Sequence, residues 1–282
     1  SSIALLVGAS VALAQTSDRG MSKKPPIDLF NLEECIPMRI EDGYVSSKPT
    51  WGGPAGIPRD FIDAHVCIQW GHGDYESWVD GKVKASWSMY EDWQGTAGMV
   101  FKDNDYHETG DGDIFLEVRK QFHNDADRSA ALWGIGVNFP TGQDYARIDT
   151  SFPGFSFLVN ERSNDIDISV FGVYTKVLDA DKRERLHGEI MHTFVRSAPL
   201  NFNSNRWFLA VGYDRPVNEK TLGLASIWWE ESASKLADDS FALQLGVRRK
   251  ESERFVWGAS FNLGLSWEDA NWGLTLAGQR RF

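Results

Sequence analysis

The sequence lacks the long apolar runs from which transmembrane helices are built. After residue 15 no stretch reaches 18 consecutive apolar residues, although the 282 residues include 17 Phe and 12 Trp. Inside a bilayer every backbone polar group must be hydrogen-bonded, so a chain without such a run can cross only as the strands of a closed barrel. If this protein lies in a membrane, we therefore expect it to cross as strands.

Runs of basic residues are also missing, and the formal net charge is -11. Phosphate backbones are bound by clustered Lys and Arg side chains, so this composition argues against nucleic acid as a partner. An acidic chain could favour cations in a pore. The net charge includes the loops, however, and is poor evidence about the wall of a pore.

Cysteine is scarce: Cys35 and Cys67 are the only two. No third or fourth ligand lies at a useful spacing from them, so we expect no metal site, and we expect no cofactor. In an oxidising compartment an isolated pair of cysteines is usually a disulfide. Closing a loop of about 32 residues would stabilise the fold by roughly 3 to 4 kcal/mol in the chain-entropy model. We therefore predict a bridge between Cys35 and Cys67.

The first 60 residues differ from the rest of the chain. Residues 1–15 begin with a short apolar run that ends in small residues, and this pattern predicts the hydrophobic and cleavage regions of a secretory signal peptide, truncated at its start. The alternative is a disordered or buried apolar tail. Residues 16–60 hold six of the ten prolines, which predicts an irregular arm, periplasmic or packed into a lumen. We expect the barrel itself to occupy residues 61–282.

From residue 65 onward, apolar and polar residues alternate with the period of two that is typical of strands. In residues 255–267 one face carries aromatic residues at both ends and aliphatic residues between them, as in a lipid-facing band with interfacial girdles. The girdle residues that we predict are Trp207, Tyr213, Trp228, Phe255, Trp257, Trp267, Trp272 and Phe282. The twelve candidate strands are 65–70, 83–90, 96–101, 113–122, 131–144, 166–177, 186–195, 207–214, 221–229, 241–249, 255–265 and 272–282.

The candidate strand 113–122 places charged residues opposite aliphatic ones. Ile114 and Val118 face one way, while Glu117 and Arg119 face the other. In a soluble core these charges would carry a heavy desolvation penalty, whereas in a water-filled barrel interior they would not. The residues that we predict to line the lumen are Glu117, Arg119, Gln121, Gln244 and Asn262. The alternative for each is a solvated wall residue without a role in selectivity.

The last strand, residues 272–282, alternates over about 11 residues and ends on Phe282. It resembles the C-terminal strand of outer-membrane β-barrels, which the assembly machinery reads, although Arg280 departs from that pattern. The resemblance implies outer-membrane lipids and the barrel-assembly machinery as partners. If Phe282 ends in the periplasm, the connections alternate between short periplasmic turns and longer external loops, with the one before Trp272 as an exception.

Two neighbouring strands carry a more specific pattern. GDGDIFLEVRKQF, a short turn and LWGIGVNFPTG together resemble the outer-membrane family named for the meta-pathway of phenol degradation. The matching residues are Gly112, Asp113, Gly134, Gly136, Pro140, Thr141 and Gly142. The resemblance covers roughly residues 80 to 282 and implies a barrel of about 12 strands with a transport role. Residues 140–142 by themselves favour a turn that ends a strand, because Pro removes a ladder donor and Gly permits positive φ.

We therefore expect an all-β, antiparallel up-and-down transmembrane barrel of about 12 strands in the bacterial outer membrane. The leading hypothesis is a passive channel or uptake porin for small molecules, hydrophobic or aromatic ones among them, with the solute itself unidentified. A closed structural or binding barrel that acts through its external loops is the alternative. A lipid hydrolase is the third, but the six His are scattered, and His187 and His192 should point to opposite faces. We expect no enzyme.

Overall fold

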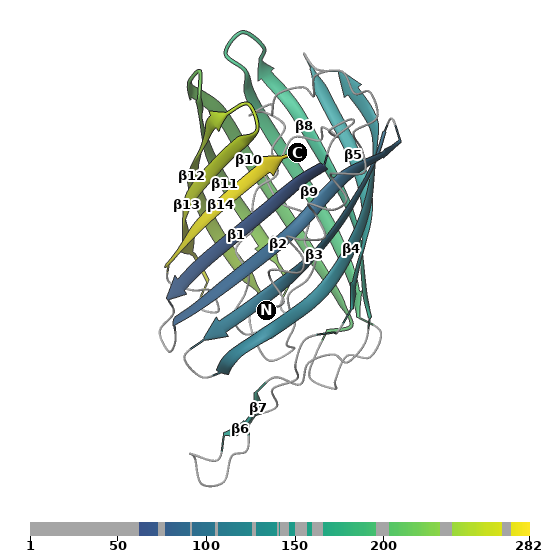
Figure 1. Ribbon diagram of the computed structural model, residues 1–282, viewed down its shortest axis with the longest axis vertical. Coiled ribbons are helices and arrows are strands. Elements are labelled where there is room, and N and C mark those ends of the chain that lie inside the picture. The colour runs from purple at the N-terminus through teal and green to yellow at the C-terminus, as the bar shows by residue number, and fades with distance from the viewer. Residues whose placement is uncertain are drawn as a thin grey trace.

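The computed structural model describes residues 62–72, 77–90, 92–104, 107–125, 128–139, 141, 147–149, 157–159, 166–195, 203–231, 239–266 and 272–282. The predicted signal peptide, the arm at 16–60 and Cys35 lie outside these residues, so the bridge stays a prediction. Twelve antiparallel strands form one closed barrel (Figure 1). They are β1 (Ile62–His72), β2 (Ser77–Tyr90), β3 (Trp93–Asn104), β4 (His107–Asp125), β5 (Ser129–Phe139), β8 (Asp167–Asp179), β9 (Glu184–Val195), β10 (Asn205–Asn218), β11 (Thr221–Glu230), β12 (Ser240–Ser252), β13 (Phe255–Gly264) and β14 (Trp272–Arg281).

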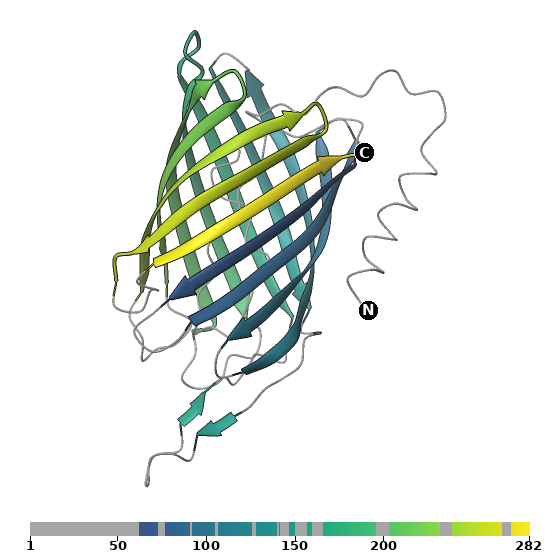
Figure 2. The same ribbon diagram turned by 60° about the vertical axis from the view of Figure 1, so that its left-hand side comes forward.

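The barrel closes where its first and last strands pair. β1 and β14 lie side by side (Figure 2), in a register that runs from Asp63 opposite Arg281 to His72 opposite Trp272. Closure leaves no sheet edge, which is the condition for strands to cross a bilayer. Two further strands, β6 (Arg147–Asp149) and β7 (Phe157–Val159), form a separate small sheet beyond one end of the barrel. The sequence did not predict this pair.

The predicted number of strands is confirmed, but several strands are longer than their alternating segments. β4 begins at His107 rather than at 113, because its ladder with β3 continues through polar residues. Alternation marks only the part of a strand that has one apolar face. β5 ends at Phe139, and the hydroxyl of Thr141 then accepts a hydrogen bond of 3.0 Å from the backbone N–H of Ile114. This contact fixes the residue that follows Pro140 against the neighbouring strand.

The connections fall into two sets, one at each rim of the barrel. One rim has turns of two to four residues, at 91–92, 126–128, 180–183, 219–220 and 253–254, and it also holds the start of β1 and the end of β14. The opposite rim has connections at 73–76, 105–106, 140–166, 196–204, 231–239 and 265–271. The connection before Trp272 is longer than every turn at the first rim, so it is no exception. Outer-membrane barrels have short periplasmic turns, and we accordingly call the first rim periplasmic and the other external.

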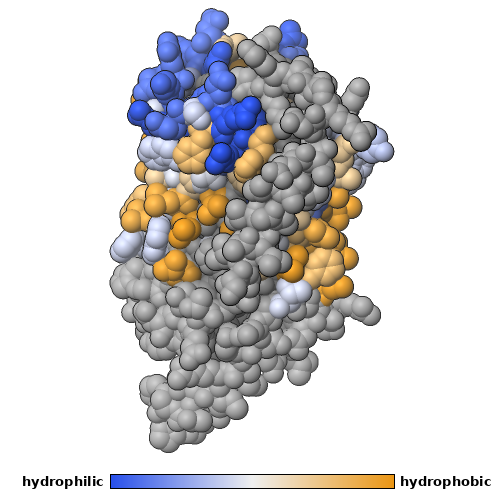
Figure 3. Space-filling model, in the orientation of Figure 1, coloured by the Kyte–Doolittle hydropathy of each residue, from blue (hydrophilic) through white to orange (hydrophobic). Residues whose placement is uncertain are grey.

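Most outward-facing side chains are apolar, and most inward-facing side chains are polar. In β10 exposed and buried residues alternate from Asn205 to Asp214, and the exposed set includes Trp207, Leu209 and Val211. Similar residues on the other strands form an apolar band, orange in Figure 3, with hydrophilic side chains toward one end. An outer surface of this kind is the lipid-facing band of a transmembrane barrel. The described residues contain no helix long and apolar enough to span a membrane.

The outer face carries the predicted aromatic residues at both rims, with one correction. Trp207 and Trp272 lie outward near the external rim, and Tyr213, Phe255, Trp257 and Phe282 lie outward near the periplasmic rim; Trp267 is outside the described residues.

The prediction for Trp228 was wrong. Its side chain is only 4% exposed and lies on the inner face, with its ring 6.2 Å from that of Phe208. Trp228 and Trp229 are consecutive, so one of them must face each way. Polar Ser226 and Glu230 share the face of Trp228, so alternation of the neighbouring residues already favoured its inward position. It is Trp229 that faces outward, and its indole N–H donates to Asp239 at 3.2 Å.

Candidate functional site

The candidate site is the inner wall of the barrel, where most of the buried side chains are polar or charged. The charged ones among the described residues are Lys84, Glu117, Arg119, Asp167, Arg185, Glu189, Arg206, Asp214, Glu230, Arg248 and Arg281. Six of these are basic and five are acidic, so this part of the wall is nearly neutral. The excess of negative charge on the whole chain therefore says little about the charge preference of the interior.

The structure places the five predicted lumen residues on the inner face, in two separate groups. Glu117, Arg119 and Gln121 follow one another on β4, whereas Gln244 lies on β12 and Asn262 on β13. All five are at most 5% exposed. Five strands separate β4 from β12 in one direction around the barrel, and five separate them in the other. The two groups therefore occupy opposite sides of the wall.

On β4 the two predicted charges pair with each other. The Nε of Arg119 donates to Glu117 Oε1 at 2.8 Å, and a terminal guanidinium nitrogen of Arg119 contacts the same oxygen. The guanidinium also lies 5.8 Å from the ring centre of Phe171 on β8. Between them on β5 is Gly134, where an added Cβ would collide with the Phe171 ring. The glycine thus makes room for the ring against which the cation rests.

On the other side of the wall, neutral side chains form a ladder of hydrogen bonds across four strands. Ser226 donates to Gln244 Oε1 at 3.1 Å, and the amide of Gln244 donates to Ser260 at 2.7 Å. The amide of Asn262 donates to Thr275 at 2.9 Å. Gln244 and Asn262 are therefore held in place by partners on the neighbouring strands.

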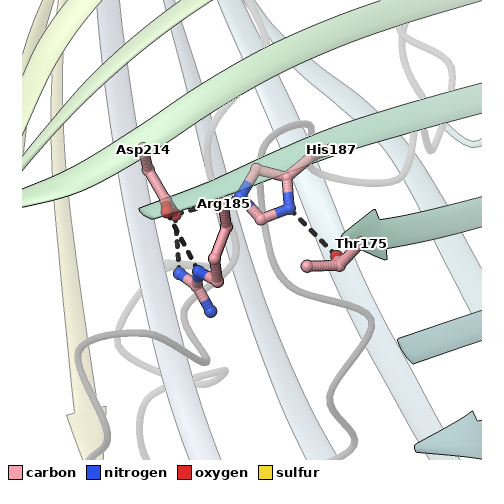
Figure 4. A network of polar contacts seen from close by, with 4 residues as sticks. All are labelled: Thr175, Arg185, His187 and Asp214. Carbon is pink, nitrogen blue, oxygen red and sulfur yellow. Dashed lines mark hydrogen bonds and ion pairs between the residues drawn. The ribbon is translucent and has the colours of Figure 1, made fainter. Parts of the chain in front are cut away.

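A third polar group, which the sequence did not predict, joins β8, β9 and β10 near the periplasmic rim (Figure 4). Arg185 donates to both carboxylate oxygens of Asp214, at 3.0 and 2.6 Å. His187 Nε2 lies 3.0 Å from Asp214 Oδ2, and its Nδ1 lies 2.9 Å from the Thr175 hydroxyl. Arg185 and His187 share one face of β9, but only the register with β8 and β10 shows what they meet.

The Thr175 hydroxyl contacts the His187 imidazole, which contacts the Asp214 carboxylate, and such a chain of contacts resembles a hydrolase site. Thr175 is only 3% exposed, however, so a substrate carbonyl cannot reach its hydroxyl in this conformation. Arg185 also holds the carboxylate in a bidentate pair. These four residues, Thr175, Arg185, His187 and Asp214, therefore link the side chains of three neighbouring strands, and we call them the polar clamp. The prediction for the two histidines is confirmed: His187 points inward, and His192 lies outward against the rings of Phe194 and Trp207.

The inner wall also carries an apolar patch, which sequence analysis missed. Its residues come from β5 and from β8 to β12, and they are Leu132, Phe171, Met191, Phe208, Ala210, Trp228 and Ala242. Within each strand these residues occupy inward positions next to polar ones, so alternation alone does not predict an apolar patch on the inner wall. Cross-strand register gathers them into one patch, beside the Glu117–Arg119 pair.

The inner side chains are more buried than a wide, water-filled pore would allow. Glu117 is 4% exposed and Arg119 is 5% exposed, so the expectation that bulk water surrounds them is wrong for this conformation. The desolvation of these charges is instead offset by their mutual pairing and by hydrogen bonds. The wall is thus polar without being open to bulk solvent at these residues.

Comparison with solved structures identifies the type of fold. No protein-family model matches the sequence, and no curated protein matches it. Among solved structures, the chain is similar to an outer-membrane channel from Pseudomonas putida F1 (TM-score 0.58, 12% identity, covering 80% of this chain and 97% of that one). It is also similar to the KdgM porin (TM-score 0.53, 7% identity, 79% and 99%) and the NanC porin (TM-score 0.50, 8% identity, 78% and 98%). The fold is therefore that of the outer-membrane β-barrels.

Proposed function

We propose that this protein is a passive channel of the bacterial outer membrane that takes up small molecules. The observation that carries the proposal is the polar inner wall, with its nearly balanced charges and its ladders of hydrogen bonds. Eleven charged side chains among the described residues of the wall suit a path for polar solutes, although their pairing also stabilises the barrel. Similarity in fold to proteins described as channels and porins supports the same function.

The wall favours solutes that combine an apolar part with a polar one. The patch around Phe171, Phe208 and Trp228 is at most 4% exposed in this conformation, so a solute meets its aromatic surface only when the interior opens. The Glu117–Arg119 pair next to it would then present one charge of each sign. Aromatic rings contribute dispersion and stacking, while the paired charges can orient a polar substituent. We propose small aromatic molecules as the first class to test.

Solute entry into liposomes tests the channel. We expect vesicles that contain the purified full-length protein to admit a small aromatic acid faster than a sugar of equal mass, with protein-free vesicles as the control. Entry of the sugar alone would contradict the proposed solute class. If no solute enters, the channel function fails.

The burial of the inner wall favours a second candidate, a closed barrel that acts through its external loops. In that case Glu117 and Arg119 would contribute to stability and not to selectivity. The liposome measurement separates the two candidates, since a closed barrel admits neither solute.

We also propose membership of the phenol meta-pathway family, which the glycine pattern around Gly134 supports. Gly134→Ala should destabilise the barrel by roughly 1 to 3 kcal/mol, because the new Cβ displaces the Phe171 ring. Gly188→Ala is the matched control: its added Cβ meets nothing within 4 Å, so the cost should be near zero. Urea unfolding followed by Trp fluorescence measures both. Equal stability of the two variants would show that the motif glycine has no packing role.

A further inference from the structure

A ring of basic side chains surrounds the outer face near the periplasmic rim. Six strands run toward this rim, and on five of them the outward-facing series carries a Lys or Arg near its periplasmic end. We call these five residues the basic collar: Lys120 on β4, Lys176 on β8, Arg215 on β10, Arg249 on β12 and Arg280 on β14. On four of these strands one more apolar residue follows on the same face: Phe122, Leu178, Val217 and Phe282. β2 is the exception, with outward Trp87 and Met89.

The collar lies near the periplasmic edge of the apolar band. On β10, for example, Val211 and Tyr213 precede Arg215 on the same face. Two collar cations lie against aromatic rings, Lys120 Nζ at 5.2 Å from the centre of Trp93 and Arg280 Cζ at 5.4 Å from that of Phe282. Aromatic side chains of this kind mark the level of the lipid headgroups, so the collar cations lie at the level of the phosphates.

Beyond the collar, charges of both signs are nearly balanced. The described turn residues that carry charge are Asp92, Asp181, Glu219 and Glu253, and Arg128, Lys182, Arg183, Lys220 and Arg254. Glu251, on β12 itself, is 3.6 Å from Arg249 and partly neutralises it. Lys176, Arg215 and Arg280 are exposed and are therefore accessible from the lipid side. The collar thus carries charge mainly of one sign beside the apolar band, whereas the turns beyond it carry charges of both signs.

We propose that the basic collar binds the phosphates of anionic phospholipids in the periplasmic leaflet. The collar complements an anionic headgroup directly, whereas a zwitterionic headgroup also brings its own cation close to the collar cations, which repel it. Lipid chains would pack against the apolar residues immediately above. The bound lipids would form an annulus of selected headgroups at one rim.

Native mass spectrometry of the full-length protein in neutral detergent tests the proposal. The probes are dioleoyl phosphatidylglycerol and dioleoyl phosphatidylcholine at equal concentration. We expect wild-type protein to retain several-fold more of the anionic lipid. The collar variant, with Lys176→Gln, Arg215→Gln and Arg280→Gln, should lose most of that preference, since each basic residue near an anionic surface is worth roughly fivefold in binding.

A matched control carries the same charge change in the turns, with Lys182→Gln, Lys220→Gln and Arg254→Gln, and it should keep the preference. Replacing Arg215 and Arg280 with Lys should also keep it. Circular dichroism and heat-modifiable gel migration verify that every variant is folded. The proposal is overturned if the wild type shows no preference, or if the collar and turn variants lose it equally, because the effect would then be one of net charge.

Discussion

Asp214→Ala should lower the free energy of unfolding by about 3 to 5 kcal/mol, because it leaves the Arg185 guanidinium buried without its carboxylate. His187 loses a partner in the same step. Urea unfolding in lipid vesicles, followed by Trp fluorescence, measures the loss.

The double variant Arg185→Met with Asp214→Leu is the informative comparison for the clamp. Removing both members of a buried ion pair costs far less than removing one. We therefore expect the double variant to recover much of the free energy of unfolding that Asp214→Ala loses. The recovery should be incomplete, since His187 still lacks the carboxylate. If the single variant is as stable as the wild type, the clamp does not hold the three strands together.

Glu117→Ala and Arg119→Ala should shift ion selectivity in opposite directions in a conducting channel. The described wall is nearly neutral, so loss of one carboxylate favours anions and loss of one guanidinium favours cations. A unit charge about 5 Å from a hydrated ion contributes about 0.8 kcal/mol in water, or roughly fourfold in the permeability ratio. Reversal potentials in planar bilayers under a salt gradient give that ratio.

Two further variants control this measurement. Gln121→Ala alters the same face of β4 without a change of charge, and it should leave the ratio unchanged. The double variant at Glu117 and Arg119 should restore a ratio close to that of the wild type. Unaltered reversal potentials in all variants would place these residues away from the path of the ions, with a purely structural role.

Period-two alternation was sufficient to predict about twelve strands and, in clear ones such as 113–122 and 255–265, which side faces inward. The reason is that in a barrel the two faces meet different solvents, so every crossing strand must alternate. Glu117 and Gln244 were found in this way. The girdle prediction for Trp228 was wrong because it rested on residue type, while Ser226 and Glu230 on the same face indicate an inward position. Alternation itself missed residues 107–112, because the ladder continues where neither face is apolar.

Features that depend on cross-strand register could not be predicted. Thr175, His187 and Asp214 lie on three different strands, and alternation shows only that each points inward. Which of them meet depends on the stagger between the strands, and a shift of two residues would keep every face and change every partner. The apolar patch has the same origin.

The seam between β1 and β14 determines the order in which this barrel can form. It pairs residues at least 200 positions apart in the chain, so it is the least local of the strand pairings in the described barrel and carries the largest loop-closure entropy. Until the last strand arrives, both β1 and β13 have unpaired backbone groups that lipid cannot satisfy. Stable insertion is therefore all-or-none, and a chain that loses its final strand loses the whole barrel rather than one twelfth of it.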